Sequence, residues 1–478
     1  MQRHCLVICI VLAVSARGQT PGPLEKAASG AELLRHGRHS ESENQFKEAL
    51  ANCSSECQQL PAILNGLGGL YYEIGRYGEA EPLLLQALDL LSREQDNRLQ
   101  AAALGNLAAV YRVQGRLTEA KPLYEHALRL QGENAEDPLQ SSSMLARMAL
   151  LAQDMGDPSG AEKLIQRALT GLERNDTEGT AETAGTLGAW AAILESEGHP
   201  QQAEEVLRRA LAIRQRISGP NDISIADALN TLGVSYSHRS QWSEAEASFR
   251  RAVAILHTNP PSSLLAAALN NLGTVWRAVG RRKEAEDSIR QAVALWELLL
   301  GQNHPNVAAG FTNLAASLEA RGRYEEASRL LDKARAIDER NFPANHPRIG
   351  IDLSRAGTLA KLRKHYAEAE TLFLHSAIIL ENALLSSDPE VGAALLNLAD
   401  VLRLEKKFGP SGATYKRGLA MLTSAWGPDD IRLAPWLEAY VSVLRQQGEF
   451  AEAGRLEIQA TRLRANERRR KGSSDPKA

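Results

Sequence analysis

Asparagine side chains recur at fixed distances from a turn that repeats along the chain. The turn residues, here called the markers, are spaced 40 to 42 residues apart: Gly75, Gly115, Gly156, Gly198, Ser240, Gly280, Gly322, Lys364, Lys406 and Gly448. Ten or nine residues before a marker stand Asn65, Asn106, Asn230, Asn270, Asn271, Asn313 and Asn397. A carboxamide both donates and accepts hydrogen bonds, so amides on one face can pair with the backbone of an extended peptide. Alternatively they bridge neighbouring repeats, and the two roles are compatible.

Basic side chains form a second periodic set, three residues before the marker. They are Arg112, Arg277, Lys361, Arg403 and Arg445. Positions ten and three before a marker are seven residues apart and share one helix face. Stacked repeats would align these cations as a stripe that steers an acidic peptide segment. The other interpretation is a solvated charge pattern, because Glu195 and Glu319 interrupt the series.

The sequence contains none of the common catalytic signatures. A P-loop, a Gly-x-Ser-x-Gly elbow, a metalloprotease helix motif and a glycine fingerprint after a strand are all missing. His304 and His346 each precede a proline, which indicates turn geometry rather than metal ligation. We therefore expect no catalytic residue, no metal site, no cofactor and no enzyme activity.

The N-terminal segment resembles a secretory signal peptide. Arg3 is followed by twelve mostly apolar residues, too few to span a bilayer, and small residues then offer a cleavage site near residue 18. We predict a signal peptide at residues 1–18, export to a periplasmic or secreted location, and no membrane span in the mature chain. Cys53 and Cys57 would then be the mature cysteines, either as a disulfide or as two free thiols.

Composition and internal spacing predict helices. Hydrophobic residues are 44%, charged residues 24%, and the net charge is −3, which excludes a disordered chain and a strongly basic nucleic-acid binder. A small residue stands seven before nearly every marker, and alanine recurs five and twelve after it. Alanines seven apart share a helix face, and a glycine turn ends the preceding helix. Each unit therefore reads as helix, turn, helix.

A single helical hairpin cannot bury both of its faces, but a stack can. The sequence predicts an all-α solenoid of ten to eleven such repeats. We expect a degenerate capping repeat at 24–60, ten repeats of about 42 residues at 61–465, and a basic disordered tail at 466–478.

This pattern resembles the tetratricopeptide repeat (TPR), and in particular the kinesin-light-chain type. The linker Leu300-Gly-Gln-Asn-His-Pro-Asn-Val-Ala308 is similar to the one that joins repeats in that type, and Asn345-His346-Pro347 matches it in part. Asn270-Asn-Leu-Gly273 is similar to the Asn-Asn-Leu-Ala start of its first helices. The resemblance implies a right-handed superhelix whose first helices line a concave groove.

The resemblance also implies a function class. We expect a non-catalytic scaffold that binds a protein or peptide partner, either an extended peptide or a partner helix, in the groove. An acidic partner segment would suit the basic stripe. The alternatives are a structural spacer and an enzyme-associated regulatory module of a larger assembly.

Overall fold

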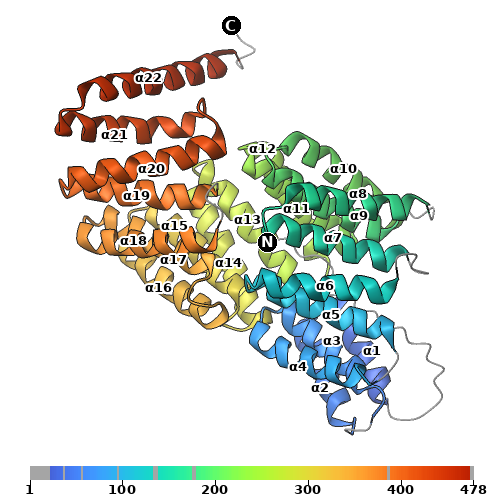
Figure 1. The fold of residues 1–478 in the computed structure, drawn as a ribbon. Coiled ribbons are helices and arrows are strands. Elements are labelled where there is room, and N and C mark those ends of the chain that lie inside the picture. The colour runs from blue at the N-terminus through green and yellow to red at the C-terminus, as the bar shows by residue number, and fades with distance from the viewer. Residues whose placement is uncertain are drawn as a thin grey trace. The chain divides into compact units, whose positions relative to one another are not determined.

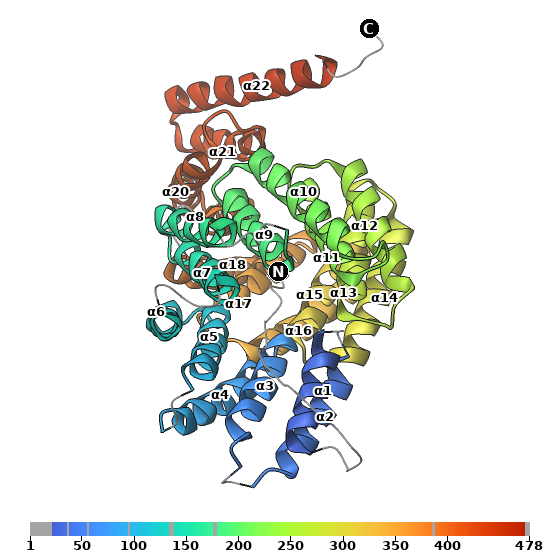
Figure 2. The same ribbon diagram turned by 90° about the vertical axis from the view of Figure 1, so that its right-hand side faces the viewer.

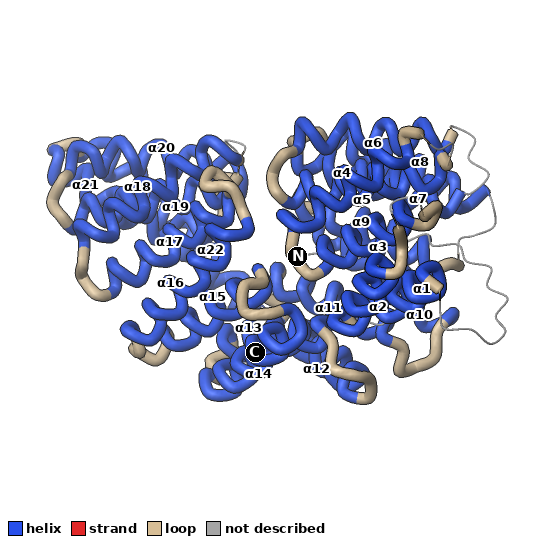
Figure 3. Tube along the Cα trace, turned by 90° about the horizontal axis from the view of Figure 1, so that it is seen from below, coloured by secondary structure: helices blue, strands red, loops and turns tan. Residues whose placement is uncertain are grey.

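The computed structural model describes residues 22–35, 38–54, 57–93, 96–132, 138–174, 179–384 and 388–473. The predicted signal peptide, residues 1–18, lies outside these ranges. Every regular element within them is a helix, and consecutive helices run back and forth as hairpins (Figures 1, 2 and 3). The predicted all-α repeat array is therefore confirmed. None of the described helices is long and apolar enough to cross a bilayer.

The chain divides into two compact units, Met1–Ser317 (unit 1) and Leu318–Ala478 (unit 2). The described helices of unit 1 are α1 (Pro23–Arg35), α2 (His39–Ala51), α3 (Leu60–Glu73), α4 (Tyr77–Leu91), α5 (Asn97–Val113), α6 (Leu117–Gln131), α7 (Pro138–Asp154), α8 (Pro158–Arg174), α9 (Ala181–Ser196), α10 (Pro200–Ile217), α11 (Ile223–His238), α12 (Trp242–His257), α13 (Ser263–Ala278) and α14 (Arg282–Leu300). Helix α15 (Pro305–Glu319) ends just beyond the boundary. The described helices of unit 2 are α16 (Tyr324–Asn341), α17 (Pro347–Leu362), α18 (Tyr366–Ala383), α19 (Pro389–Leu404), α20 (Phe408–Trp426), the 3-10 helix η1 (Ile431–Leu433), α21 (Ala434–Gln447) and α22 (Phe450–Ser473).

All ten markers adopt the left-handed backbone conformation that ends a helix. Seven are glycines with positive φ, and Ser240, Lys364 and Lys406 adopt φ of 57°, 62° and 62°. In each copy the N–H after the marker bonds to the carbonyl five residues earlier, as from Arg76 to Tyr71 at 2.8 Å. Of the two hydrogen bonds that define the Schellman motif, this is the one that spans more residues. Because it forms at all ten markers, the turn has the same geometry whether the marker is a glycine or not.

Small residues on the first helix receive large residues from the second. A Cβ added to Gly68 would lie 2.7 Å from Leu84, and one added to Gly233 would lie 2.7 Å from Phe249. The alanines five after the markers are fully buried or nearly so: Ala80, Ala120, Ala161, Ala203, Ala245, Ala285, Ala327, Ala369 and Ala453. The predicted close approach of the two helices in each repeat is confirmed.

First helices of neighbouring repeats contact one another directly, as α3 with α5, α11 with α13 and α17 with α19. Beyond its own repeat, a second helix contacts chiefly the first helix of the following repeat, as α12 with α13 and α18 with α19. The closer spacing of the first helices places them on the inner side of the curve within each unit.

The two ends of the array differ in how they match the sequence prediction. Helices α1 and α2 form the hairpin expected of the capping repeat. At the other end the expectation of a disordered tail is wrong for residues 466–473, because α22 continues through Ser473. Arginine, alanine, glutamate and lysine in this stretch are good helix formers, which explains the extension. Residues 474–478 lie outside the described part of the chain.

Candidate functional site

The inner-face asparagines bond to one another from repeat to repeat. The Nδ2 of Asn106 donates to Oδ1 of Asn65 at 2.9 Å, and Asn271 donates in the same way to Asn230 at 3.0 Å. Asn313 donates to Asn270 at 3.0 Å. In each bond the donor stands nine residues before the marker of its own repeat. The acceptor stands ten residues before the marker of the preceding repeat. We call these three bonds the amide ladder; they show the bridging role that the sequence left open.

The ladder amides differ in how far solvent reaches them. Asn65, Asn106 and Asn270 are buried, at 1%, 2% and 7% exposed. Asn230, Asn271 and Asn313 are only partly buried. A primary amide has two N–H groups and each ladder bond uses one, so the partly exposed Asn271 and Asn313 each retain a second N–H donor.

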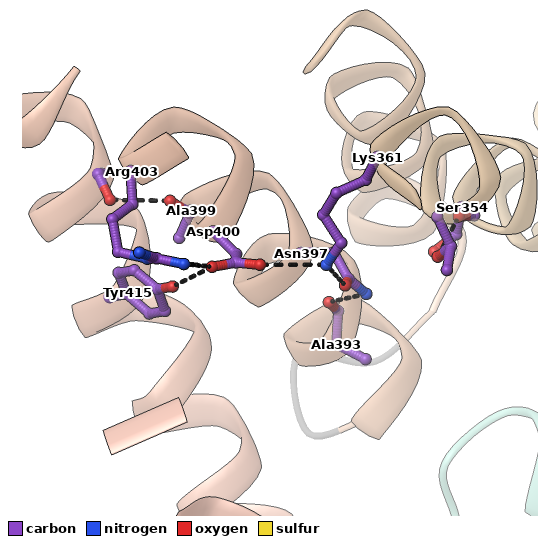
Figure 4. A network of polar contacts seen from close by, with 10 residues as sticks. Ser354, Lys361, Ala393, Asn397, Ala399, Asp400, Arg403 and Tyr415 are labelled. Carbon is purple, nitrogen blue, oxygen red and sulfur yellow. Dashed lines mark hydrogen bonds and ion pairs between the residues drawn. The ribbon is translucent and has the colours of Figure 1, made fainter. Parts of the chain in front are cut away.

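In unit 2 the inner face carries a charged network centred on Asp400 of α19 (Figure 4). Lys361 Nζ of α17 lies 3.1 Å from Oδ2, and Arg403 Nη2 donates to Oδ1 at 2.7 Å. The buried Tyr415 hydroxyl of α20 donates to the same Oδ1 at 3.2 Å. Asn397 accepts from Lys361 at 3.3 Å and donates to the carbonyl of Ala393 at 3.1 Å.

The network fixes the ionisation of its members. Burial raises the pKa of Asp400, but the Arg403 hydrogen bond and the charges of Lys361 and Arg403 outweigh it and lower the pKa below the usual value. Burial and the Asp400 charge raise the pKa of Tyr415. Asp400 is therefore ionised at neutral pH, and two cations against one carboxylate leave one net positive charge.

Two of the remaining predicted basic residues pair with a carboxylate. Arg112 Nη1 pairs with Asp154 at 2.7 Å, and Arg445 Nη2 pairs with Glu457 of α22 at 2.8 Å. Arg277 lies in the last turn of α13. Arg355 holds the ladder-donor position before Lys364; it is exposed, and no hydrogen bond or ion pair to it occurs within the described residues.

A set of arginines just after the markers was missed by the sequence analysis. Arg116 lies 3.7 Å from the ring centre of Tyr111 and 2.9 Å from Glu81 of the preceding repeat. Arg76 repeats this arrangement with Tyr71 and Glu43, and Arg281 does so with Trp276 and Glu246. The signal was an arginine one residue after the marker and an aromatic four before it. These contacts join repeats rather than form a binding site.

The cysteines and linker histidines have structural roles. Cys53 and Cys57 form a disulfide in the connection between α2 and α3, with Cα atoms 5.5 Å apart. The Nδ1 of His304 accepts from the backbone N–H of Asn306 at 2.9 Å, and His346 does the same for Arg348 at 3.2 Å. Both histidines therefore cap the start of the following helix.

The inner face offers hydrogen bonds and charge rather than reactive groups. Among the described residues no three histidine, cysteine, aspartate or glutamate side chains gather as metal ligands would. A small cavity of about 70 Å³ between α16, α17 and α18 includes Asp332, Arg335 and Arg363 in its lining. A cavity of this size has room for a few water molecules.

The comparisons with known proteins concern the repeats. The family model for the tetratricopeptide repeat matches residues 59–133, 99–174, 182–256, 264–340 and 308–382, together more than half of the chain. BtubC (BKLC) from P. vanneervenii is 23% identical over 48% of this chain and 92% of its own, with a TM-score of 0.39. A protein of Podosopora anserina designated a kinesin light chain, with nearly identical TPR-like repeats, is 24% identical over 43% and 98%, with a TM-score of 0.36. No curated protein sequence matches the chain.

Proposed function

The chain belongs to the tetratricopeptide repeat family, and from this premise we propose that it is a non-catalytic scaffold whose inner face binds an extended acidic peptide segment of a partner protein. The observation that carries the proposal is the partly exposed section of the amide ladder at Asn271 and Asn313. Asn271 and Asn313 are held by their ladder bonds and keep one N–H each. Donors fixed in place in this way lose little conformational entropy when a peptide carbonyl binds.

Unit 2, taken by itself, has an inner face that favours an acidic segment of the partner. The Asp400 network has one net positive charge, and Arg355 adds a cation without an ion pair among the described residues. Positive charge of this kind accelerates association with an acidic segment and weakens as salt is added. Export to a periplasmic or secreted location remains part of the same proposal, since the amino-terminal residues carry the pattern of a signal peptide.

Selection from a displayed random-peptide library tests the proposal without a known partner. We expect the selected peptides to be enriched in aspartate and glutamate. In calorimetry, Asn271→Ala with Asn313→Ala should raise the dissociation constant about tenfold, the effect of one or two hydrogen bonds.

Two matched controls separate binding from stability and charge. Asn106→Ala removes an equivalent ladder bond at a buried position, so it should leave affinity unchanged. For a segment bound to unit 2, Arg355→Glu should weaken binding, whereas Lys416→Glu makes the same charge change on the exposed side of α20 and should not. If wild type and the Asn271/Asn313 variant bound the peptides with equal affinity, the proposal that the inner face binds them would be wrong. A spacer role would then be favoured.

A further inference from the structure

Two buried carboxyl groups face each other between α16 and α17 in unit 2. Asp338 is 1% exposed and Asp352 is 8% exposed. Oδ1 of Asp338 and Oδ2 of Asp352 are buried, and no donor among the described residues bonds to either. The two side chains lie within hydrogen-bonding reach of each other. Two carboxyl oxygens in this arrangement can bond only if a proton lies between them.

The surroundings supply too little positive charge to ionise both groups. Arg348 of α17 pairs with the other oxygen of Asp338 at 3.0 Å, and Arg355 acts on Asp352 from the next turn. On the α18 side, Gly350 of α17 packs against Ile379 and Leu380, and the Ser376 hydroxyl donates to the carbonyl of Gly350 at 2.7 Å, so α18 brings no charged group to Gly350. Two carboxylates in a buried site cannot both be charged at low cost, so one stays protonated.

The same residues form the connection that sets the direction of α17. The rings of Phe342 and His346 stack at 4.5 Å, and the Arg348 guanidinium lies 5.1 Å from the centre of Phe342. His346 caps the first turn of α17 through the N–H of Arg348. Arg348 thus links the connection, the helix start and the carboxyl pair.

We propose that a proton shared between Asp338 and Asp352 holds α17 against α16, and that its loss loosens this joint, which makes unit 2 responsive to pH. A TPR array transmits changes between neighbouring repeats, because each repeat packs only on the next. The α16–α17 joint is thereby a pH-regulated hinge within unit 2.

The direction of the response follows from linkage. Burial and the negative charge of Asp338 raise the pKa of Asp352 to about 7. Burial likewise raises the pKa of Asp338. A group whose folded pKa is raised stabilises the fold below its unfolded pKa, and this contribution is lost as pH rises toward the folded value. The joint should be tightest in mild acid and loosest above neutral pH.

Hydrogen exchange on the full chain measures the joint directly. In wild type, protection of amides between residues 338 and 352, corrected for intrinsic exchange, should fall about tenfold from about pH 5.5 to about pH 8.5. Asp352→Asn should abolish the change, since its amide donates to Asp338 at any pH. His346, the other titratable side chain at this connection, is intact in that variant. Asp332→Asn is the control: Asp332 is exposed and lies on α16 with Asp338, so this variant should behave as wild type.

Two results would overturn the proposal. One is wild-type protection that does not change with pH, or that changes equally in Asp352→Asn. The second result comes from carboxyl ¹³C spectra of aspartate-labelled wild type, which need no variant. These spectra should contain one aspartate carboxyl group that titrates at about pH 7. If every aspartate titrated below about pH 5, the shared proton would not exist.

Discussion

Asn106 and Asn65 are forty-one residues apart in sequence, yet Nδ2 of the first donates to Oδ1 of the second at 2.9 Å inside the protein. Both side chains are almost fully buried. Removing one partner strands the other without a hydrogen bond, which costs about 1–3 kcal/mol. We therefore predict that Asn106→Ala lowers the free energy of unfolding by this amount in chemical denaturation. Asn382→Ala, on an exposed part of α18, is the control and should change it little.

The markers without glycine give a stabilising prediction. Lys364 adopts φ of 62°, a conformation that is unfavourable for any residue with a Cβ. Lys364→Gly should raise the free energy of unfolding by about 0.5–1 kcal/mol, measured by denaturant titration. The reverse change at an equivalent turn, Gly322→Ala, should lower it by a similar amount. A destabilised Lys364→Gly protein would mean that the Lys364 side chain makes a contact worth more than the backbone strain.

The arginines beside the markers should matter more than ordinary surface charges. Arg116 packs on Tyr111 and binds Glu81 of the preceding repeat, and its side chain is mostly covered. Arg116→Ala should cost about 1–2 kcal/mol, from the lost cation–π contact and ion pair together. Arg93→Ala breaks an exposed pair between Arg93, just after the end of α4, and Asp89, and should cost less than about 0.5 kcal/mol. Equal effects would show that Arg116 contributes no more than a surface pair.

Acid should weaken unit 2 through Asp400. Its pKa is below the usual aspartate value, because Arg403 and Lys361 outweigh the effect of burial. A lowered folded pKa stabilises the protein above the unfolded pKa, near about 3.9, and this stabilisation is lost as pH falls through the folded value. Thermal melts from about pH 6 down to about pH 3 should therefore lose less stability in Asp400→Asn than in wild type. Parallel curves for the two proteins would contradict this role of the network.

Repeat architecture could be predicted from sequence because each repeat carries the same spacing. The turn could be predicted even at Ser240, Lys364 and Lys406, which are not glycines. The spacing of the surrounding alanines and small residues located the turn in those repeats. The tetratricopeptide resemblance is confirmed by the family model. The tail was mistaken because charge suggested solvation, whereas helix propensity extended α22 to Ser473.

Side-chain partners were harder to predict than positions. The sequence placed Asn271 and Asn230 on one face, but their bond depends on the offset between neighbouring helices, which spacing within a repeat does not give. The stripe of cations was predicted without Asp400, which stands at another position and binds Lys361 and Arg403. The Asp338–Asp352 pair occurs once, so no periodic signal marked it.

The most direct test of the scaffold assignment is a crystal structure of the full chain with a selected acidic peptide. We predict an extended peptide on the first helices, with its backbone carbonyls within hydrogen-bond distance of Nδ2 of Asn271 and Asn313. A peptide seated on the second helices or at the end of the array, with both amides untouched, would contradict the account.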